Sequence, residues 1–399
     1  MSNADPAIVR LQARDPEISG RILVIGADLV MPKLFYFGDR LRPLGIGYTV
    51  YTHDVTAASR AHAEAAGAEL IAAPPHRPGP WRLLRDLWTL IRRVKAADYR
   101  HAELYSDYHM IASLFYLLIL RLKNIPVILW CRGELFDWPT FTWWERLYFH
   151  IAIPLARRVI LKERYMIETL RGAGIHEESK TIELHNSVPV PRWERETPFP
   201  QETIRLLFMN SFKTWRNVSF CVELAVALRD SGIPFSMKIV GDKPAEPGLV
   251  EEARRLREGL AAHGLGELVT VHPFTDEPRP YYEQADIFVL PANVIYCNFG
   301  LLEAMAYGLV PVVNSRDHDF GLIIEEGVSG FGLPLVPDLW VDKIQGLAHR
   351  REEARAMSRA ARARIRDRFS TAKMFDTYAC AIGITDGENM QLQSQPRST

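Results

Sequence analysis

Residues 287–314 read IFVLPANVIYCNFGLLEAMAYGLVPVVN. This stretch decides the fold, because a short apolar strand is followed by a loop, a helical run and a second apolar strand. A loop that opens a helix between two buried strands presents backbone N–H groups and the positive end of the helix dipole, which suits a phosphate or diphosphate. The stretch therefore predicts a nucleotide-binding loop in a parallel α/β domain.

The same rhythm of short strands and longer helical runs extends along most of the chain. Predicted strands are RILVIG (21–26), YTVYT (48–52), AELIA (68–72), HAELYS (101–106), PVILWC (126–131), RVILK (158–162), IRLLFMN (204–210), FSMKIVG (235–241), LVTVH (268–272), DIFVL (286–290) and LVPVV (309–313). The proline-rich and charged segment 188–201 separates the first six from the last five. We therefore predict two doubly wound α/β domains joined by one linker.

Composition narrows the class of protein. The 399 residues suffice for two domains, and 48 basic residues balance 48 acidic ones, which disfavours a nucleic-acid binder. The four cysteines form no C-x-x-C pair, so we expect a reducing compartment and neither a zinc site nor a disulfide framework. The N-terminus has no signal-peptide core, and the longest apolar run, 110–120, is below the roughly 18 to 20 residues of a membrane span.

The segment 299–308, FGLLEAMAYG, followed by Pro311-Val312-Val313, resembles the donor-binding signature of retaining glycosyltransferases of family 4. The resemblance covers about residues 20 to 385 and implies an α/β GT-B fold, in which two Rossmann-like domains face each other across a cleft. It implies an acceptor domain (20–195), a nucleotide-sugar donor domain (196–370) and a C-terminal helix that crosses back to the first domain (371–387). Residues 1–19 form an N-terminal extension, and the polar composition of the tail (388–399) predicts that it is disordered.

The resemblance also implies roles on the donor side. Glu303 matches the glutamate that holds the ribose, while Ile295 stands eight positions earlier, where the family has another glutamate. Arg216 aligns with the family's lysine, Ser211 stands in place of its arginine, and Lys213 could supply the lost charge. These cations would stabilise the diphosphate leaving group. The alternative interpretation is that Lys213 and Arg216 are ordinary solvated charges.

Further donor contacts are expected from two loops. The loop Cys297, Asn298, Phe299, Gly300 and Leu301 would hold phosphate, mainly through backbone N–H groups. Cys297 itself suits a packing residue better than a nucleophile. Gly241-Asp242 matches the strand end that approaches the donor, although a strand followed by Gly-Asp is also a plain turn.

Four residues are candidates for the acceptor side. Gly38-Asp39 stands where the family often has a glycine pair, and His109 and Arg132 follow predicted strands at the edge where α/β proteins bind ligands. The Gly38-Asp39 signal is weak, and His109 or Arg132 taken alone is more often a structural residue. Arg132-Gly133 replaces the family's usual His-Gly, so acceptor chemistry can differ.

No metal site and no resident cofactor are predicted. Asp317-His318-Asp319 could be interpreted as the metal-binding Asp-x-Asp of the other large glycosyltransferase fold, since paired carboxylates bind Mg²⁺ or Mn²⁺. Such a triplet is common by chance, and here it follows a strand late in the second predicted domain. We therefore expect a loop at this point and no metal.

One helical segment has the pattern of a membrane-surface helix. Residues 81–95, WRLLRDLWTLIRRVK, place Leu, Trp and Ile on one side, with Arg82, Arg85, Arg92, Arg93 and Lys95 around them. The aromatic run FTWWERLYFH (141–150) adds to this pattern. A helix packed on the sheet would have the same pattern, so both interpretations stay open.

The resemblance implies a metal-independent retaining hexosyltransferase, and the absence of a signal-peptide core and of paired cysteines predicts a cytoplasmic location; the pattern of residues 81–95 leaves open a place at the inner face of the membrane. Its donor would be a UDP- or GDP-sugar, and its acceptor a glycan or a lipid-linked hydroxyl in polysaccharide or glycolipid assembly. The alternative from another class is a degenerate GT-B protein that binds nucleotide-sugar or glycan as a non-catalytic subunit, since Ile295 and Ser211 replace charged residues. Hydrolysis or epimerisation of a nucleotide-sugar is a third interpretation.

Overall fold

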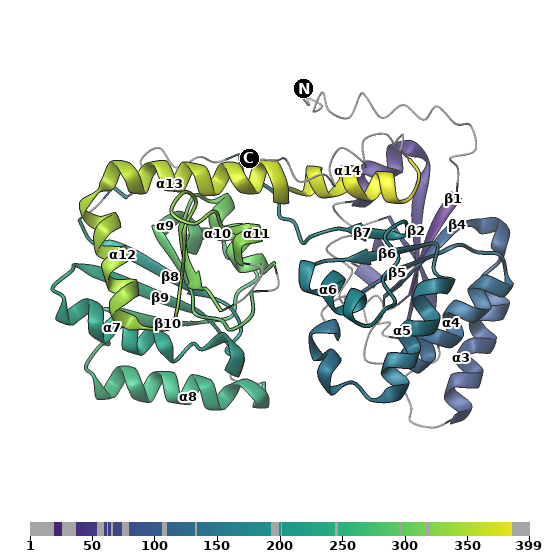
Figure 1. The fold of residues 1–399 in the computed structure, drawn as a ribbon, viewed down its shortest axis with the longest axis horizontal. Helices are drawn as coiled ribbons and strands as arrows, with labels where there is room; N and C mark the ends of the chain where they lie inside the picture. The colour runs from purple at the N-terminus through teal and green to yellow at the C-terminus, as the bar shows by residue number, and fades with distance from the viewer. Residues whose placement is uncertain are drawn as a thin grey trace. The chain divides into compact units, whose positions relative to one another are not determined.

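The computed structural model describes residues 20–25, 37–53, 60–61, 63–64, 67–73, 80–105, 110–131, 134–192, 199–200, 202–243, 246–295, 297–316 and 320–384. The chain divides into two compact units, the first formed by residues 1–184 and 375–399 and the second by residues 185–374. Each unit contains a parallel sheet with helices packed on it (Figure 1). The predicted N-terminal extension (1–19) and tail (388–399) lie outside the described residues.

The first unit is built on a seven-stranded sheet in the order β3-β2-β1-β4-β5-β6-β7. Its strands are β1 (Gly20–Ile25), β2 (Ile46–Thr52), β3 (Glu69–Ala72), β4 (Tyr99–Tyr105), β5 (Val127–Trp130), β6 (Arg158–Leu161) and β7 (Thr181–Glu183). All neighbours pair in parallel. Strands β1, β5 and β6 read as nearly continuous apolar runs, as expected for strands of a parallel sheet whose two faces are covered by helices.

Helices of the first unit are α3 (Pro80–Arg93), α4 (Met110–Leu122), α5 (Trp143–Leu155) and α6 (Arg164–Gly172), with 3-10 turns at Arg42–Leu44, Ala96–Asp98 and Glu134–Thr140. The inner sides of α3, α4 and α5 share one buried cluster, to which they contribute Leu90, Leu117 and Phe149. A capping box starts α5, since Thr142 and Glu145 bond each other's backbone N–H. The three helices therefore pack on the same face of the sheet, and their outer sides point the same way.

The C-terminal helix α14 (Thr371–Ala381) crosses the division between the units, which lies after Met374. From Phe375 onward it packs within the first unit, where Tyr378 stacks on Phe37 with ring centroids 4.5 Å apart. The Tyr378 hydroxyl donates a hydrogen bond to the buried carboxylate of Glu103 in β4 at 2.5 Å. Because a buried carboxylate needs such donors, this bond fixes the helix to the strand.

The second unit is built on a six-stranded parallel sheet in the order β10-β9-β8-β11-β12-β13. Its strands are β8 (Ile204–Met209), β9 (Phe235–Asp242), β10 (Val269–Pro273), β11 (Ile287–Leu290), β12 (Val310–Asn314) and β13 (Phe331–Leu333). Its helices are α7 (Phe220–Asp230), α8 (Pro247–Ala262), α9 (Arg279–Gln284), α10 (Phe299–Ala306), α11 (Phe320–Ile323), α12 (Pro337–His349) and α13 (Arg351–Arg364), with a π-helical turn at Ile365–Phe369 and a 3-10 turn at Thr214–Arg216.

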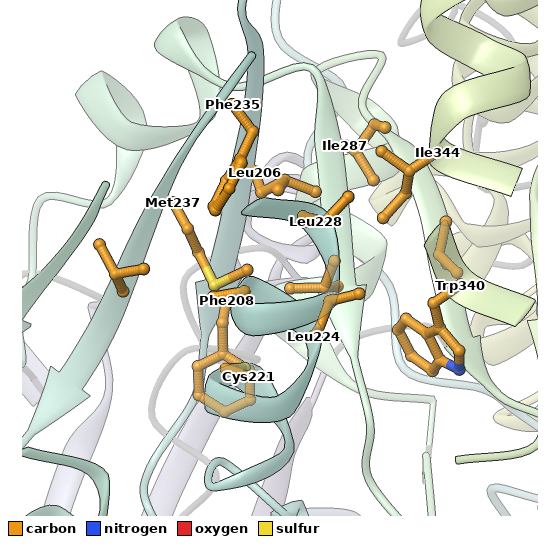
Figure 2. Close-up of a cluster of buried hydrophobic side chains, with 14 of the residues drawn as sticks. Leu206, Phe208, Cys221, Leu224, Leu228, Phe235, Met237, Ile287, Trp340 and Ile344 are labelled. Carbon is orange, nitrogen blue, oxygen red and sulfur yellow. The ribbon is translucent and has the colours of Figure 1, made fainter. Parts of the chain in front are cut away.

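Both faces of this sheet are buried, as the alternation of side chains along β8 shows. Leu206 and Phe208 point into a cluster with α7, α8 and α12, part of which Figure 2 draws. Leu207 points into a second cluster with α9, α10 and the π-helical turn. Since successive side chains of a strand alternate between faces, an uninterrupted apolar strand requires helices on both sides.

The predicted α/β architecture with two parallel sheets is confirmed. Each of the eleven predicted strands overlaps an observed one. The sequence analysis missed β7 and β13, each of which has three residues. Such short strands carry too little alternation or apolar length to be recognised.

Candidate functional site

The order of the strands in the second unit marks one point of its sheet as a binding site. From β8 the chain moves to β9 and β10 on one side, and β11 then pairs with β8 on the other side. In open parallel sheets, ligands bind where the strand order reverses, beyond the carboxyl ends of the two strands. The loops after β8 and β11 therefore border the expected site.

Hydrogen bonds join these two loops directly. The Asn293 N–H donates to the Trp215 carbonyl at 2.9 Å. The Asn217 side-chain amide donates to the Pro291 carbonyl at 2.8 Å and to the Asn293 side-chain oxygen at 2.9 Å. Asn217 has a left-handed backbone, with φ of 51°, a conformation that asparagine tolerates better than most residues. The loop after β8 is thus fixed against the loop that leads into α10.

The two predicted cations stand on either side of Trp215. Lys213 is exposed, and its ammonium lies 5.0 Å from the centre of the Trp215 ring. Arg216 is half-buried and donates from Nη1 to the Val294 carbonyl at 3.4 Å. The structure therefore brings Lys213 and Arg216 beside the segment that leads into α10, as a site for a bound anion requires.

Two glycines let the end of β8 approach its neighbours closely. A Cβ on Gly241, whose φ is 131°, would lie 1.9 Å from the Asn210 carbonyl oxygen. A Cβ on Gly300 would lie 2.8 Å from the Met209 carbonyl oxygen. Both contacts are shorter than any real Cβ contact, so only glycine allows this packing. Gly241 and Gly300 thereby set the spacing of β9 and α10 around the end of β8.

Asp242 has a structural partner in α8. Its side chain is buried and accepts a hydrogen bond from the Arg257 guanidinium. This ion pair connects the end of β9 to α8, so one side of the carboxylate is engaged within the protein. The predicted donor contact of Asp242 stays a prediction.

The start of α10 uses two of the five predicted loop residues for its own cap. The Asn298 side chain accepts from the Leu301 N–H at 3.1 Å, as a helix N-cap does. Cys297 is buried, has φ of 43° and accepts at its carbonyl from the Asn186 amide at 3.1 Å. The Leu301 N–H is therefore engaged, and the first N–H groups of the helix, those of Phe299 and Gly300, lack intrahelical acceptors.

Glu303 lies one turn into α10 and is held by a tyrosine of α9. The Tyr282 hydroxyl donates to Glu303 Oε2 at 2.8 Å. Burial raises the pKa of Glu303, although the hydrogen bond from Tyr282 opposes this. Tyr282 is buried and stacks on Tyr307, with ring centroids 5.3 Å apart. Tyr282 thus orients the carboxylate, a role that the sequence analysis did not assign.

The predicted acceptor-side residues are only partly described. Gly38 is buried and Asp39 is exposed, with Asp39 3.8 Å from the Arg42 guanidinium. His109 and Arg132 lie outside the described residues, as does the triplet Asp317-His318-Asp319. Among the described residues, no group of three or more His, Cys, Asp or Glu side chains could hold a metal ion. No described helix is long and apolar enough to cross a membrane.

Comparison with known proteins finds one family model that matches most of the second unit. Residues 190–364 match the family model of glycosyl transferases group 1. No curated protein matches the sequence significantly.

Solved structures match over nearly the whole chain. A glycosyltransferase from Rickettsia africae has a TM-score of 0.75 at 14% identity, covering 92% of this chain and 100% of its own. The Anabaena protein HepE in complex with UDP and glucose has a TM-score of 0.71 at 14% identity, with the same coverage of 92% and 100%. Sucrose-phosphate synthase from Thermosynechococcus elongatus has a TM-score of 0.65 at 15% identity, covering 94% and 100%. At these identities the likeness shows the fold, which is GT-B.

Proposed function

We propose that the protein is a retaining glycosyltransferase, because residues 190–364 match the family model of glycosyl transferases group 1. It would move a hexosyl group from a UDP- or GDP-sugar to a hydroxyl of a glycan or lipid-linked acceptor, in polysaccharide or glycolipid assembly. One observation carries the proposal. The Trp215–Asn293 and Asn217–Pro291 hydrogen bonds hold the loop that carries the two cations against the segment that leads into α10.

Each donor-side group has a physical task in this reaction. Lys213 and Arg216 stabilise the negative charge that develops on the diphosphate as the glycosidic bond breaks. The N-terminus of α10 adds N–H donors and the positive end of a helix dipole. Glu303 accepts hydrogen bonds from the ribose hydroxyls, and Tyr282 holds it in place. The acceptor hydroxyl attacks from the side of the leaving group, and a donor phosphate oxygen helps remove its proton.

Lys213 and Arg216 would supply the positive charge that a metal ion supplies in other transferases. We therefore propose that transfer is metal-independent and needs no resident cofactor. The HepE structure contains UDP and glucose, which supports a UDP-sugar as the first donor to test. The four cysteines form no C-x-x-C pair and no secreted disulfide pattern in the sequence, which supports a cytoplasmic location.

The first test is donor binding, measured by calorimetry with a panel of UDP- and GDP-sugars. Glu303→Ala should weaken binding about 10- to 100-fold, as expected for the loss of hydrogen bonds to a charged group. The matched control is Glu223→Ala, since Glu223 is exposed on α7. Equal affinities for the two variants, or no binding by the unmodified protein, would contradict the proposal.

The second test is turnover. Arg216→Ala should lower kcat about 100-fold or more, because its charge acts mainly on the transition state. Arg359→Ala, an exposed position on α13, is the control. Release of free sugar or an altered donor without acceptor would instead favour hydrolysis or epimerisation.

A non-catalytic subunit that binds nucleotide-sugar is the second candidate. Ile295, in place of the family's glutamate, is fully buried in the apolar cluster with α10. Position 295 therefore offers no carboxylate to a donor sugar. Binding without turnover in the isolated chain would favour this candidate, and turnover would eliminate it.

A further inference from the structure

Exposed apolar side chains are concentrated on three helices of the first unit. Among the described residues, ten of the seventeen exposed large hydrophobic side chains lie on α3, α4 and α5. We call these ten side chains the α3–α5 patch: Trp81, Leu84, Trp88 and Ile91 on α3, Phe115, Leu118 and Leu122 on α4, and Trp143, Trp144 and Leu147 on α5. Large exposed apolar patches on a folded protein mark interaction surfaces.

The part of the patch on α3 forms a continuous stripe along the helix. Trp81, Leu84, Trp88 and Ile91 follow one another at intervals of three, four and three residues, so they share one side of the helix. Trp81 is 80% exposed. On α4 the same spacing joins Phe115, Leu118 and Leu122.

The opposite side of α3 is firmly attached to its own unit. Asp86 is buried and accepts hydrogen bonds from the hydroxyls of Tyr51 in β2, at 2.5 Å, and Tyr116 in α4. Burial raises the pKa of Asp86, but hydrogen bonds from His53, Tyr116 and Tyr51 outweigh it, so the pKa lies below its usual value. One side of α3 is therefore packed in its own unit, and the apolar stripe lies on the outer side of the helix.

Helices α3, α4 and α5 lie next to one another, so their outer sides form one surface. Lys123, just after α4, donates from Nζ to the Ile91 carbonyl of α3 at 2.8 Å. Both α3 and α5 pack against α4, and Figure 1 shows the three helices on the same side of the first sheet.

Cationic side chains border the patch. Arg85, Arg92, Arg93 and Lys95 are exposed on or just after α3, as are Arg121 on α4 and Arg146 on α5. The guanidinium of Arg92 lies 4.6 Å from the centre of the Trp88 ring. The single acidic residue of α3 is the buried Asp86, and α4 has none. Apolar and aromatic side chains flanked by arginines and lysines match the boundary between the acyl chains and head groups of an anionic bilayer.

We propose that the α3–α5 patch docks the first unit on an anionic lipid bilayer, with the tryptophans inserted at the head-group boundary. A second copy of the chain fits less well, because a two-fold contact pairs the patch with itself and would bring its cationic border against an equally cationic border. This proposal is independent of the glycosyltransferase assignment, and its test uses neither donor nor acceptor.

The test is flotation of the full chain with vesicles of phosphatidylcholine alone, or with about a third of the lipid replaced by phosphatidylglycerol. We expect binding to the anionic vesicles and a loss of binding as salt increases. Trp81→Ser with Trp88→Ser should weaken binding about tenfold or more, since both side chains bury apolar area in the bilayer. Trp143→Ser with Trp144→Ser on α5 provides a second, separate variant of the patch.

Arg92→Glu with Arg93→Glu should weaken binding at least about 25-fold, from about 1 kcal/mol for each cation near an anionic surface. The control variant, Lys343→Glu with Arg359→Glu, changes the net charge by the same amount but at positions on α12 and α13. It should bind like the unmodified protein. Melting temperatures verify that each variant is folded. Equal binding by the patch variants and the unmodified protein would overturn the proposal. So would a dimer, seen by light scattering, that the tryptophan substitutions abolish.

Discussion

Glu303 combines burial with a task that requires charge. Burial raises the pKa of its carboxylate. The hydroxyl of Tyr282 in α9 donates a hydrogen bond to the same carboxylate and opposes this shift. A raised pKa means that the folded state disfavours the ionised form, so the native protein carries this cost at neutral pH. A bound ribose would add hydrogen-bond donors to the carboxylate and offset part of the cost.

Glu303→Gln should therefore raise the melting temperature near neutral pH while it weakens donor binding. The sign follows from the raised pKa. Stability associated with protonated Glu303 is present below the unfolded pKa and is lost as pH rises through the folded value. The gain from glutamine should consequently shrink at acid pH, where the glutamate is protonated in both states. Thermal melts from acid to neutral pH measure this, and a gain independent of pH would contradict it.

Ile295 shows how an exchange of one residue changes the role of a position. Ile295→Glu would restore the residue that the resembling family has there, but it would place a carboxylate among buried apolar side chains. We expect a loss of about 2 kcal/mol or more in the free energy of unfolding. Urea denaturation measures it. A stable variant with higher transfer activity would instead show that the loop readily turns this position outward.

At the scale of elements, the candidate site depends on how closely β9 and α10 approach the end of β8. That approach requires glycine at 241 and 300. The N-cap at Asn298 then fixes where α10 starts, and therefore where its first N–H groups point. The position of the loops is thus encoded in small residues, while the ligand chemistry depends on the charged ones.

Gly241→Ala should lower the free energy of unfolding by about 2 to 4 kcal/mol, because the methyl group meets the Asn210 carbonyl and the backbone is left-handed. Gly248→Ala is the matched control. Its Cβ meets nothing within 4 Å, and its place in α8 favours alanine, so it should be neutral or stabilising. Equal free energies of unfolding for the two variants would contradict the close contact between Gly241 and the end of β8.

Strands and cations of the candidate site could be predicted from the sequence, whereas several of its contacts could not. Lys213, Arg216 and Glu303 were found because local motifs contain them. Tyr282 was missed, because its partner Glu303 is 21 residues away and only the packing of α9 on α10 brings them together. Asn217 and Asn293 were missed for the same reason. The outer stripe of α4 was also missed, since a sequence does not reveal which side of an apolar helix faces outward.

For the whole molecule, the two proposed activities lie on different units. A nucleotide donor should slow hydrogen exchange in the loops after β8 and β11 and at the start of α10. Anionic vesicles should slow it in α3, α4 and α5. Mass spectrometry of the full chain with each ligand separates the two effects. Protection of the same segments by both ligands would contradict the assignment of two sites.

The anchoring of α3 by Asp86 has a consequence for how the protein reaches a surface. Many peripheral helices are unstructured in water and become ordered only when they meet lipid, which costs conformational entropy. Here Tyr51 and Tyr116 already clamp the helix from within. The protein would then bind to the bilayer as a preformed rigid body. Its far-ultraviolet circular dichroism would show no coil-to-helix transition on binding. Its strength would depend on the preformed array of rings and charges alone.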